Sequence, residues 1–173
     1  MPNKKIIQGT GLDDQTENEF YRKFSFELNG NYGKKNLDCD FKRRKDINQL
    51  HPKTGYLIVR APFKRSEKLL TALAKGIYIL HEAFIRKVIK DEKWIDPKEF
   101  DIGNSVSNSS PMTELHFPSY TQRTMVKNKG GIFSKECVVV LLEGTELKRK
   151  YERILEAGGA NVLSRTVHHL ADR

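Results

Sequence analysis

The sequence predicts an α/β protein built on a parallel sheet with helices over both faces. Strand-like and helix-like segments alternate over residues 4–103 in the order β-α-β-β-α-β-α, which is typical of parallel sheets. The apolar, β-branched run YLIVRA at residues 56–61 is typical of a strand buried on both faces. A stretch rich in Ser, Asn and Thr follows, and then a β-α-β pattern begins again. We therefore expect a domain at residues 4–103, a linker at residues 104–130 and a partial second repeat at residues 131–173.

The first strand and first helix are indicated by turn signals and by apolar spacing. The strand at residues 4–8 should end at Gly9-Thr10-Gly11, because glycines break a strand. Asp13 or Asp14 can cap the helix that follows. Phe20, Phe24 and Leu28 recur four residues apart, and this spacing predicts a helix over about residues 15–28.

The middle of the chain supplies the remaining elements of the first domain. They are a strand at residues 37–41, a strand at residues 56–61, a helix at residues 67–75, a strand at residues 77–80 and an amphipathic helix at residues 81–94. Ser66 is a favourable N-cap for the helix at residues 67–75, and Gly76 is a favourable stop. Two cations, Arg65 and Lys68, lie at that helix start, where the backbone N–H groups and the helix dipole favour an anion.

The second repeat is expected to contain only its opening elements. GIFSKECVVVLLEG at residues 131–144 is expected to form a strand with a polar exit. A helix at residues 145–157 is stopped by Gly158-Gly159, and a short strand follows. The rest of that sheet is not expected within the 173 residues. One short ordered turn is predicted near Glu114 of the linker.

Charge and composition narrow the class of partner. The net charge of +9 favours an acidic partner, such as nucleic acid, a phosphorylated protein or an anionic membrane surface. No apolar run approaches the roughly 20 residues that span a bilayer, and the N-terminus shows no apolar secretory segment. Cys39 and Cys137 are far apart in sequence, and we expect both thiols to be free in a reducing compartment.

The motifs resemble those of the BRCT family. Residues 54–94 resemble the second half of a BRCT domain, with a buried strand, a Ser/Thr-x-Lys helix start, an A-x-G-I-x-I-L segment and a third helix that carries an aromatic. Phe84 stands where the family usually has Trp. KKIIQGTG at residues 4–11 resembles the first strand, and residues 131–163 resemble the opening of a second repeat. The chain resembles tandem-repeat scaffold proteins of DNA repair.

This resemblance implies the BRCT fold, with a four-stranded parallel sheet flanked by helices and a partial second β-α-β repeat. It also implies a nuclear, non-enzymatic scaffold that binds phosphoserine or phosphothreonine on a partner protein. The family's phosphate ligands match Thr10, Gly11 and Lys68. A hydroxyl, a close backbone N–H and a lysine at a helix N-terminus are suited to phosphate. Arg65 is a further candidate, for the phosphopeptide backbone or a neighbouring acidic residue.

Two other functions stay open on the sequence alone. Lys42, Arg43, Arg44 and Lys45 form a basic run that could contact DNA phosphates or chromatin. The apolar run at residues 138–142 could instead serve a protein–protein contact that does not depend on phosphate. No catalytic constellation is recognisable, and His168-His169 with Cys137 fit no zinc spacing. We therefore expect no enzymatic activity, no cofactor, no metal and no membrane partner.

Overall fold

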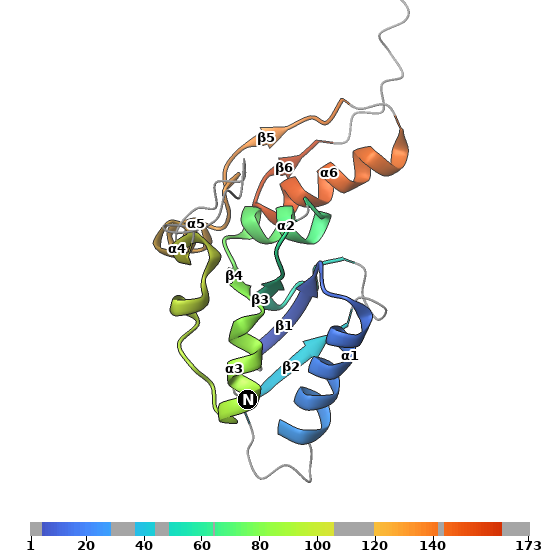
Figure 1. Cartoon of the computed structure of the whole chain (residues 1–173). Helices are drawn as coiled ribbons and strands as arrows, with labels where there is room; N and C mark the ends of the chain where they lie inside the picture. Colours follow the sequence, from blue (N-terminus) through green and yellow to red (C-terminus); the bar gives the residue numbers. More distant parts are fainter. Residues whose placement is uncertain are drawn as a thin grey trace, which may run out of the picture.

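Four parallel strands form the central sheet of the protein (Figure 1). The computed structural model describes residues 5–28, 37–43, 49–63, 65–105, 120–141 and 144–163. The strand order is β2-β1-β3-β4. The strands are β1 (Lys5–Thr10), β2 (Cys39–Lys42), β3 (Thr54–Val59) and β4 (Tyr78–His81). The predicted fold class, with its four-stranded parallel sheet, is confirmed.

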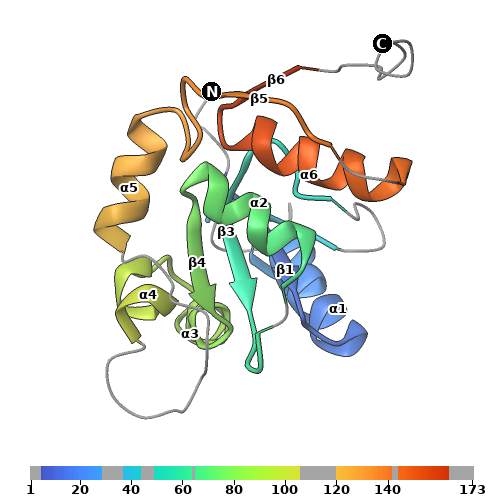
Figure 2. The ribbon, with the colours of Figure 1, turned by 90° about the horizontal axis from the view of Figure 1, so that it is seen from above.

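Helices cover both faces of this sheet (Figures 1 and 2). On one face lie α1 (Asp14–Arg22), its π-helical continuation η1 (Lys23–Leu28) and α3 (Ala83–Asp91). Their aromatic and aliphatic side chains form one core with β1 and β2, which includes Phe20, Phe24, Phe41, Phe84 and Ile85, all fully buried. The opposite face carries α2 (Glu67–Lys75). As expected for a sheet buried on both sides, Leu57 and Ile58 of β3 are both inaccessible to solvent.

Helix α2 begins and ends where its capping residues predict. The Ser66 side chain accepts a hydrogen bond from the Leu69 N–H, which is the geometry of an N-cap. Gly76 has a φ of 68°, in the left-handed region that favours glycine at a helix end. Leu69 and Ala72 pack onto the sheet with 1% and 0% exposure. The caps fix the helix register, and the apolar face fixes its rotation.

A helix within the predicted linker packs against the end of α2. The chain passes through η2 (Pro97–Phe100), α4 (Ile102–Ser105) and α5 (Tyr120–Asn128). A Cβ added to Gly76 would lie 2.5 Å from the Arg123 carbonyl oxygen, so α5 approaches α2 as closely as a glycine allows. The Arg123 side chain forms an ion pair with Asp101, and both are almost fully buried. Glu114 lies outside the described residues.

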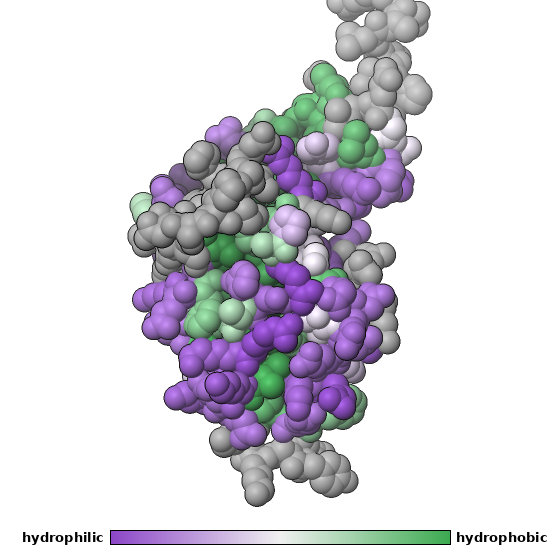
Figure 3. Space-filling model, viewed as in Figure 1, coloured by the Kyte–Doolittle hydropathy of each residue, from purple (hydrophilic) through white to green (hydrophobic). Residues whose placement is uncertain are grey.

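The second unit has the predicted β-α-β order but very short strands. It consists of β5 (Cys137–Val138), α6 (Thr145–Ala157) and β6 (Asn161–Val162), and the two strands pair in parallel. Of the apolar run at residues 138–142, β5 includes Val138, and Leu141 beyond the strand is 75% exposed. Figure 3 shows green, hydrophobic surface near the top of the molecule, in the region of β5 and α6. Ile132 N–H donates to the Ala74 oxygen at 2.9 Å, which helps to seat the unit on α2.

None of the helices within the described residues is both long and apolar enough to cross a bilayer.

The buried pair of Asp101 and Arg123 gives a stability prediction. Arg123→Met should lower the free energy of unfolding by about 3–5 kcal/mol, because it leaves a buried carboxylate without its counter-ion. Lys127→Met, at an exposed position of the same helix, should have little effect. Urea unfolding measures both. Adding Asp101→Asn should recover part of the loss, because the amide oxygen can still accept the Gly103 N–H bond. Equal stability of Arg123→Met and wild type would contradict the prediction.

Candidate functional site

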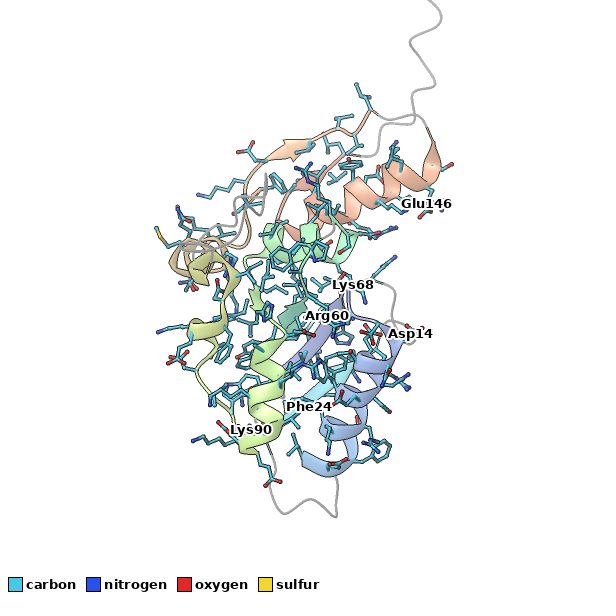
Figure 4. The ribbon with its side chains drawn as sticks, in the orientation of Figure 1. Asp14, Phe24, Arg60, Lys68, Lys90 and Glu146 are labelled. Carbon is cyan, nitrogen blue, oxygen red and sulfur yellow. The ribbon has the colours of Figure 1, made fainter. Side chains whose placement is uncertain are left out.

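The structure brings Thr10, Gly11 and Lys68 to one hollow at the end of β1. This hollow, which we call the β1–α2 hollow, has a volume of about 660 Å³. It is lined by residues 9–13, Glu17, residues 60–62 and residues 66–68. Parallel pairing places the carboxyl ends of β1 and β3 at the same edge of the sheet, with Thr10 opposite Val59. Figure 4 shows Lys68 and Arg60 at this edge, below α2.

Thr10 is joined directly to the start of α2. Its Oγ1 lies 2.9 Å from the Ser66 Oγ, and that oxygen also accepts from the Leu69 N–H at 3.2 Å. A hydroxyl both donates and accepts, so this pair forms a short chain from β1 to the first turn of α2. Gly11 follows with a φ of 73°, where a residue without a Cβ is favoured.

Lys68 lies in the first turn of α2 and is only 5% exposed. The lining residue Glu17 of α1 is equally buried, at 5%. A Cβ added to Gly9 would lie 3.3 Å from the Glu17 Oε1 and 2.6 Å from the Leu12 side chain. A side chain at position 9, within β1, would therefore clash with Leu12 and crowd the Glu17 carboxylate. Glu17 was not among the residues predicted from the sequence, although its place four residues after the Asp13 cap puts it on the turn of α1 nearest the strand end.

Arg60 joins three elements beside the same hollow. Its Nε donates to Glu82 Oε2 at 2.8 Å, its Nη2 donates to Thr16 Oγ1 at 2.9 Å, and its Nη1 pairs with the Asp13 carboxylate. The hydrogen bonds to Glu82, the largest cause, and to Asp13 raise the pKa of Arg60. Arg60 was not among the residues predicted from the sequence. The available signal was its position immediately after a strand that pairs with β1.

The charges around the β1–α2 hollow are mixed. Asp13, Glu17 and Glu67 line it together with Arg60 and Lys68. Arg60 is shared between Asp13 and Glu82, and Glu67 is paired with Arg153 of α6. Lys68 is therefore the cation that the first turn of α2 presents to this hollow, and the carboxylates of Asp13, Glu17 and Glu67 line the same hollow.

The other predicted residues lie elsewhere. Arg65 is exposed, directly before the Ser66 cap, and is not part of the lining. Lys42 pairs with Asp40 at 2.7 Å. The Arg43 guanidinium stacks on the Tyr21 ring, 3.8 Å from its centroid. Of the predicted basic run, Arg44 and Lys45 lie outside the described residues.

Metal ligands do not gather in the part of the chain that the structure describes. No group of three or more His, Cys, Asp or Glu side chains there could hold an ion. Cys137 is exposed in β5, and Cys39 is buried in β2. His168 and His169 lie outside the described residues.

Asp13 gives a prediction for pH dependence. The backbone hydrogen bond from Thr16 and then the hydrogen bond from Arg60 lower the pKa of Asp13 from 3.8 to about 2. Because folding favours the carboxylate, its stabilising contribution is fully present above the ordinary pKa and is lost as the pH falls through about 2. Arg60→Gln should raise the pKa of Asp13 toward 3.8 without reaching it, since the Thr16 N–H still donates.

Carboxyl-carbon NMR titration measures this shift. Asp91 is the internal control, because its pKa is lowered mainly by the Lys87 side chain and should not move in Arg60→Gln. An unchanged Asp13 pKa in that variant would show that Arg60 does not hold the carboxylate in solution.

Comparison with known proteins identifies the fold. No protein-family model matches the chain. The sequence is 30% identical over 164 residues to SMC5-SMC6 complex localization factor protein 1 of Homo sapiens, and 29% identical over 164 residues to that of Mus musculus. These alignments cover 92% of this chain but only 14% of each relative. The crystal structure of the S. pombe Brc1 BRCT5-BRCT6 domains superimposes with a TM-score of 0.61 at 15% identity, over 94% of this chain and 66% of that one. The resemblance to tandem BRCT proteins is thus confirmed, and the chain has the BRCT fold.

Proposed function

We propose that this chain is a non-catalytic BRCT scaffold module of DNA repair, which binds a phosphorylated serine or threonine of a partner protein in the β1–α2 hollow. The DNA-repair role and a nuclear location are supported by the similarity to a protein named as a localization factor of the SMC5-SMC6 complex. That similarity extends over 92% of this chain. The chain spans 14% of the length of that relative, so the proposal concerns this module alone.

One observation carries the phosphate part of the proposal. A threonine hydroxyl, a glycine N–H and a lysine from three different positions of the sequence meet at one hollow, beside the N-terminus of a nine-residue helix. A phosphate monoester carries about −1.5 to −2 charges at neutral pH. Each charge-assisted hydrogen bond contributes roughly 1.5–3 kcal/mol, so two or three of them with side-chain contacts correspond to micromolar affinity.

The carboxylates of the hollow make this affinity modest. Asp13 is held by Arg60 and Glu67 by Arg153, which reduces the repulsion that each exerts on an incoming phosphate. Glu17 is a third acid on the same lining and is 5% exposed. We therefore expect Lys68 to be essential, since without it the first turn of α2 would offer the phosphate only backbone N–H groups.

Arg65 has a different place in the proposal. It is exposed beside the hollow and can contact an acidic residue next to the phosphorylated one without touching the phosphate itself. Its replacement by Gln should weaken binding of peptides with a flanking Asp or Glu more than binding of peptides without one.

Direct nucleic-acid binding is less favoured by the structure. Of the basic run, Lys42 is engaged with Asp40, and Arg43 is stacked on Tyr21. A nucleic-acid site would show a steep loss of affinity with salt and no dependence on peptide phosphorylation. A protein contact without phosphate dependence would also not depend on peptide phosphorylation, but its affinity would lack the steep loss with salt.

Lys68→Gln tests the proposed site. Binding to a degenerate phosphoserine and phosphothreonine peptide library is measured for wild type, and the selected peptide is then titrated in phosphorylated and unphosphorylated form. Lys68→Gln should weaken phosphopeptide binding by about tenfold or more, the equivalent of one charge-assisted bond, without changing binding of the unphosphorylated peptide.

Lys90→Gln is the matched control for this experiment. Lys90 is an exposed lysine in the last turn of α3, distant from Lys68 in Figure 4. The Lys90→Gln substitution removes the same charge as Lys68→Gln, and this variant should bind the phosphopeptide like wild type. A thermal unfolding scan of each variant confirms that the fold is retained. Equal affinity of wild type for the phosphorylated and unphosphorylated peptides would refute the proposed phosphate recognition.

A further inference from the structure

A pair of side chains connects the second unit to the rim of the proposed phosphate site. Arg153 of α6 reaches Glu67 in the first turn of α2, although 86 positions separate them in sequence. Its Nε donates to Glu67 Oε1 at 2.8 Å, and its Nη2 donates to Glu67 Oε2 at 3.2 Å. Two parallel bonds of this kind fix the orientation of both groups.

The position of Glu67 gives this pair its importance. Glu67 directly precedes Lys68, and both residues line the β1–α2 hollow. Its side chain is 23% exposed and that of Arg153 is 32% exposed, so the pair is partly shielded from water. A carboxylate next to the lysine would oppose any phosphate drawn to that lysine, because like charges at close range repel more strongly away from bulk solvent.

We propose that Arg153 is a positioning residue of the phosphate site, which neutralises Glu67 so that the neighbouring Lys68 can accept a phosphorylated ligand. This inference rests on the proposed function. It assigns to the second unit a part in phosphate binding even though Arg153 is not among the residues that line the hollow.

The surroundings support a charge role for this pair. Asp13, another acid of the same hollow, is also held by an arginine, Arg60. The hydrogen bond to Glu67 is the main cause that raises the pKa of Arg153. An arginine stays charged at every accessible pH, so the compensation of Glu67 persists through the whole neutral range.

The seating of the second unit fixes where Arg153 lies. Ile132 N–H donates to the Ala74 oxygen at 2.9 Å, and Phe133 N–H donates to the Gly158 oxygen at 2.7 Å. A Cβ added to Gly158 would lie 3.1 Å from the Ala74 Cβ, so the end of α6 packs tightly at the end of α2. With that end anchored, Arg153, which precedes Gly158 by more than one helical turn, meets the opposite end of α2.

The test compares four variants of the full chain with one probe. The probe is the tightest phosphoserine or phosphothreonine peptide that wild type selects from a degenerate library, in phosphorylated and unphosphorylated form. The variants are Arg153→Gln, Glu67→Gln, the double variant and Arg149→Gln. Arg149 is an exposed arginine one turn earlier on the same helix, so its replacement removes the same charge without breaking the pair of Arg153 with Glu67.

Arg153→Gln should weaken phosphopeptide binding by about three- to tenfold, as expected for one uncompensated charge near a partly solvated anion. The double variant should return to wild-type affinity, because the repelling carboxylate is gone. A purely structural role of Arg153 predicts no such rescue. The difference between Arg153→Gln and wild type should shrink at high salt, and Arg149→Gln should bind like wild type.

Several results would overturn the inference. Equal binding by Arg153→Gln and wild type, or a double variant as weak as Arg153→Gln, would refute it while leaving the proposed function intact. A wild-type chain that selects no phosphopeptide would refute both. If the Arg153→Gln variant unfolds, the Glu67→Gln variant alone tests the inference. This variant must bind the phosphopeptide more tightly than wild type, because it lacks the repelling carboxylate. Unchanged or weaker binding would refute the inference.

Discussion

The packing of helix α2 on both of its sides is the constraint on which the rest of the structure depends. One side buries Leu69 and Ala72 against the sheet. The other side meets the second unit through Ala74 and the pair of Glu67 with Arg153. A helix held in this way cannot rotate without disturbing the core on one side, since packed interiors tolerate little displacement, and breaking the contacts with the second unit on the other. The direction in which the first turn of α2 points is therefore fixed by contacts from both units.

Sheet topology supplies the other half of the site. In a parallel sheet, adjacent strands end at the same edge, and the connections from β1 and β3 both leave from there. The turn after β1 brings Gly11, and the turn after β3 brings the start of α2. The bond between Thr10 and Ser66 joins these two turns directly. Residues 10 and 68 therefore meet as a consequence of strand order, whatever ligand the hollow binds.

The sequence predicts the elements of the first domain well because their signals are local. Ser66 and Gly76 mark the ends of α2 through backbone chemistry that involves only a few neighbouring residues. The apolar spacing of α1 and the alternation of strands and helices depend on equally short patterns.

The charged partners of the site were harder to predict. Arg60, Glu17 and Arg153 owe their roles to contacts between elements that are distant in sequence, and no periodicity reveals which carboxylate a given arginine will meet. The strand β5 is also shorter than predicted, since it ends at Val138, the first residue of the apolar run at residues 138–142.

The two cations at the start of α2 have different surroundings. Arg65 is exposed at the surface, whereas Lys68 is buried in the hollow, beside the helix N-terminus. Burying a cation at the positive end of a helix costs free energy that nearby anions must offset. The acids of the hollow can supply part of this compensation, and a bound phosphate would supply more, since it carries up to two charges and several acceptor oxygens. The same acids would then limit the affinity, which makes the arginines that hold them as relevant to ligand binding as the lysine itself.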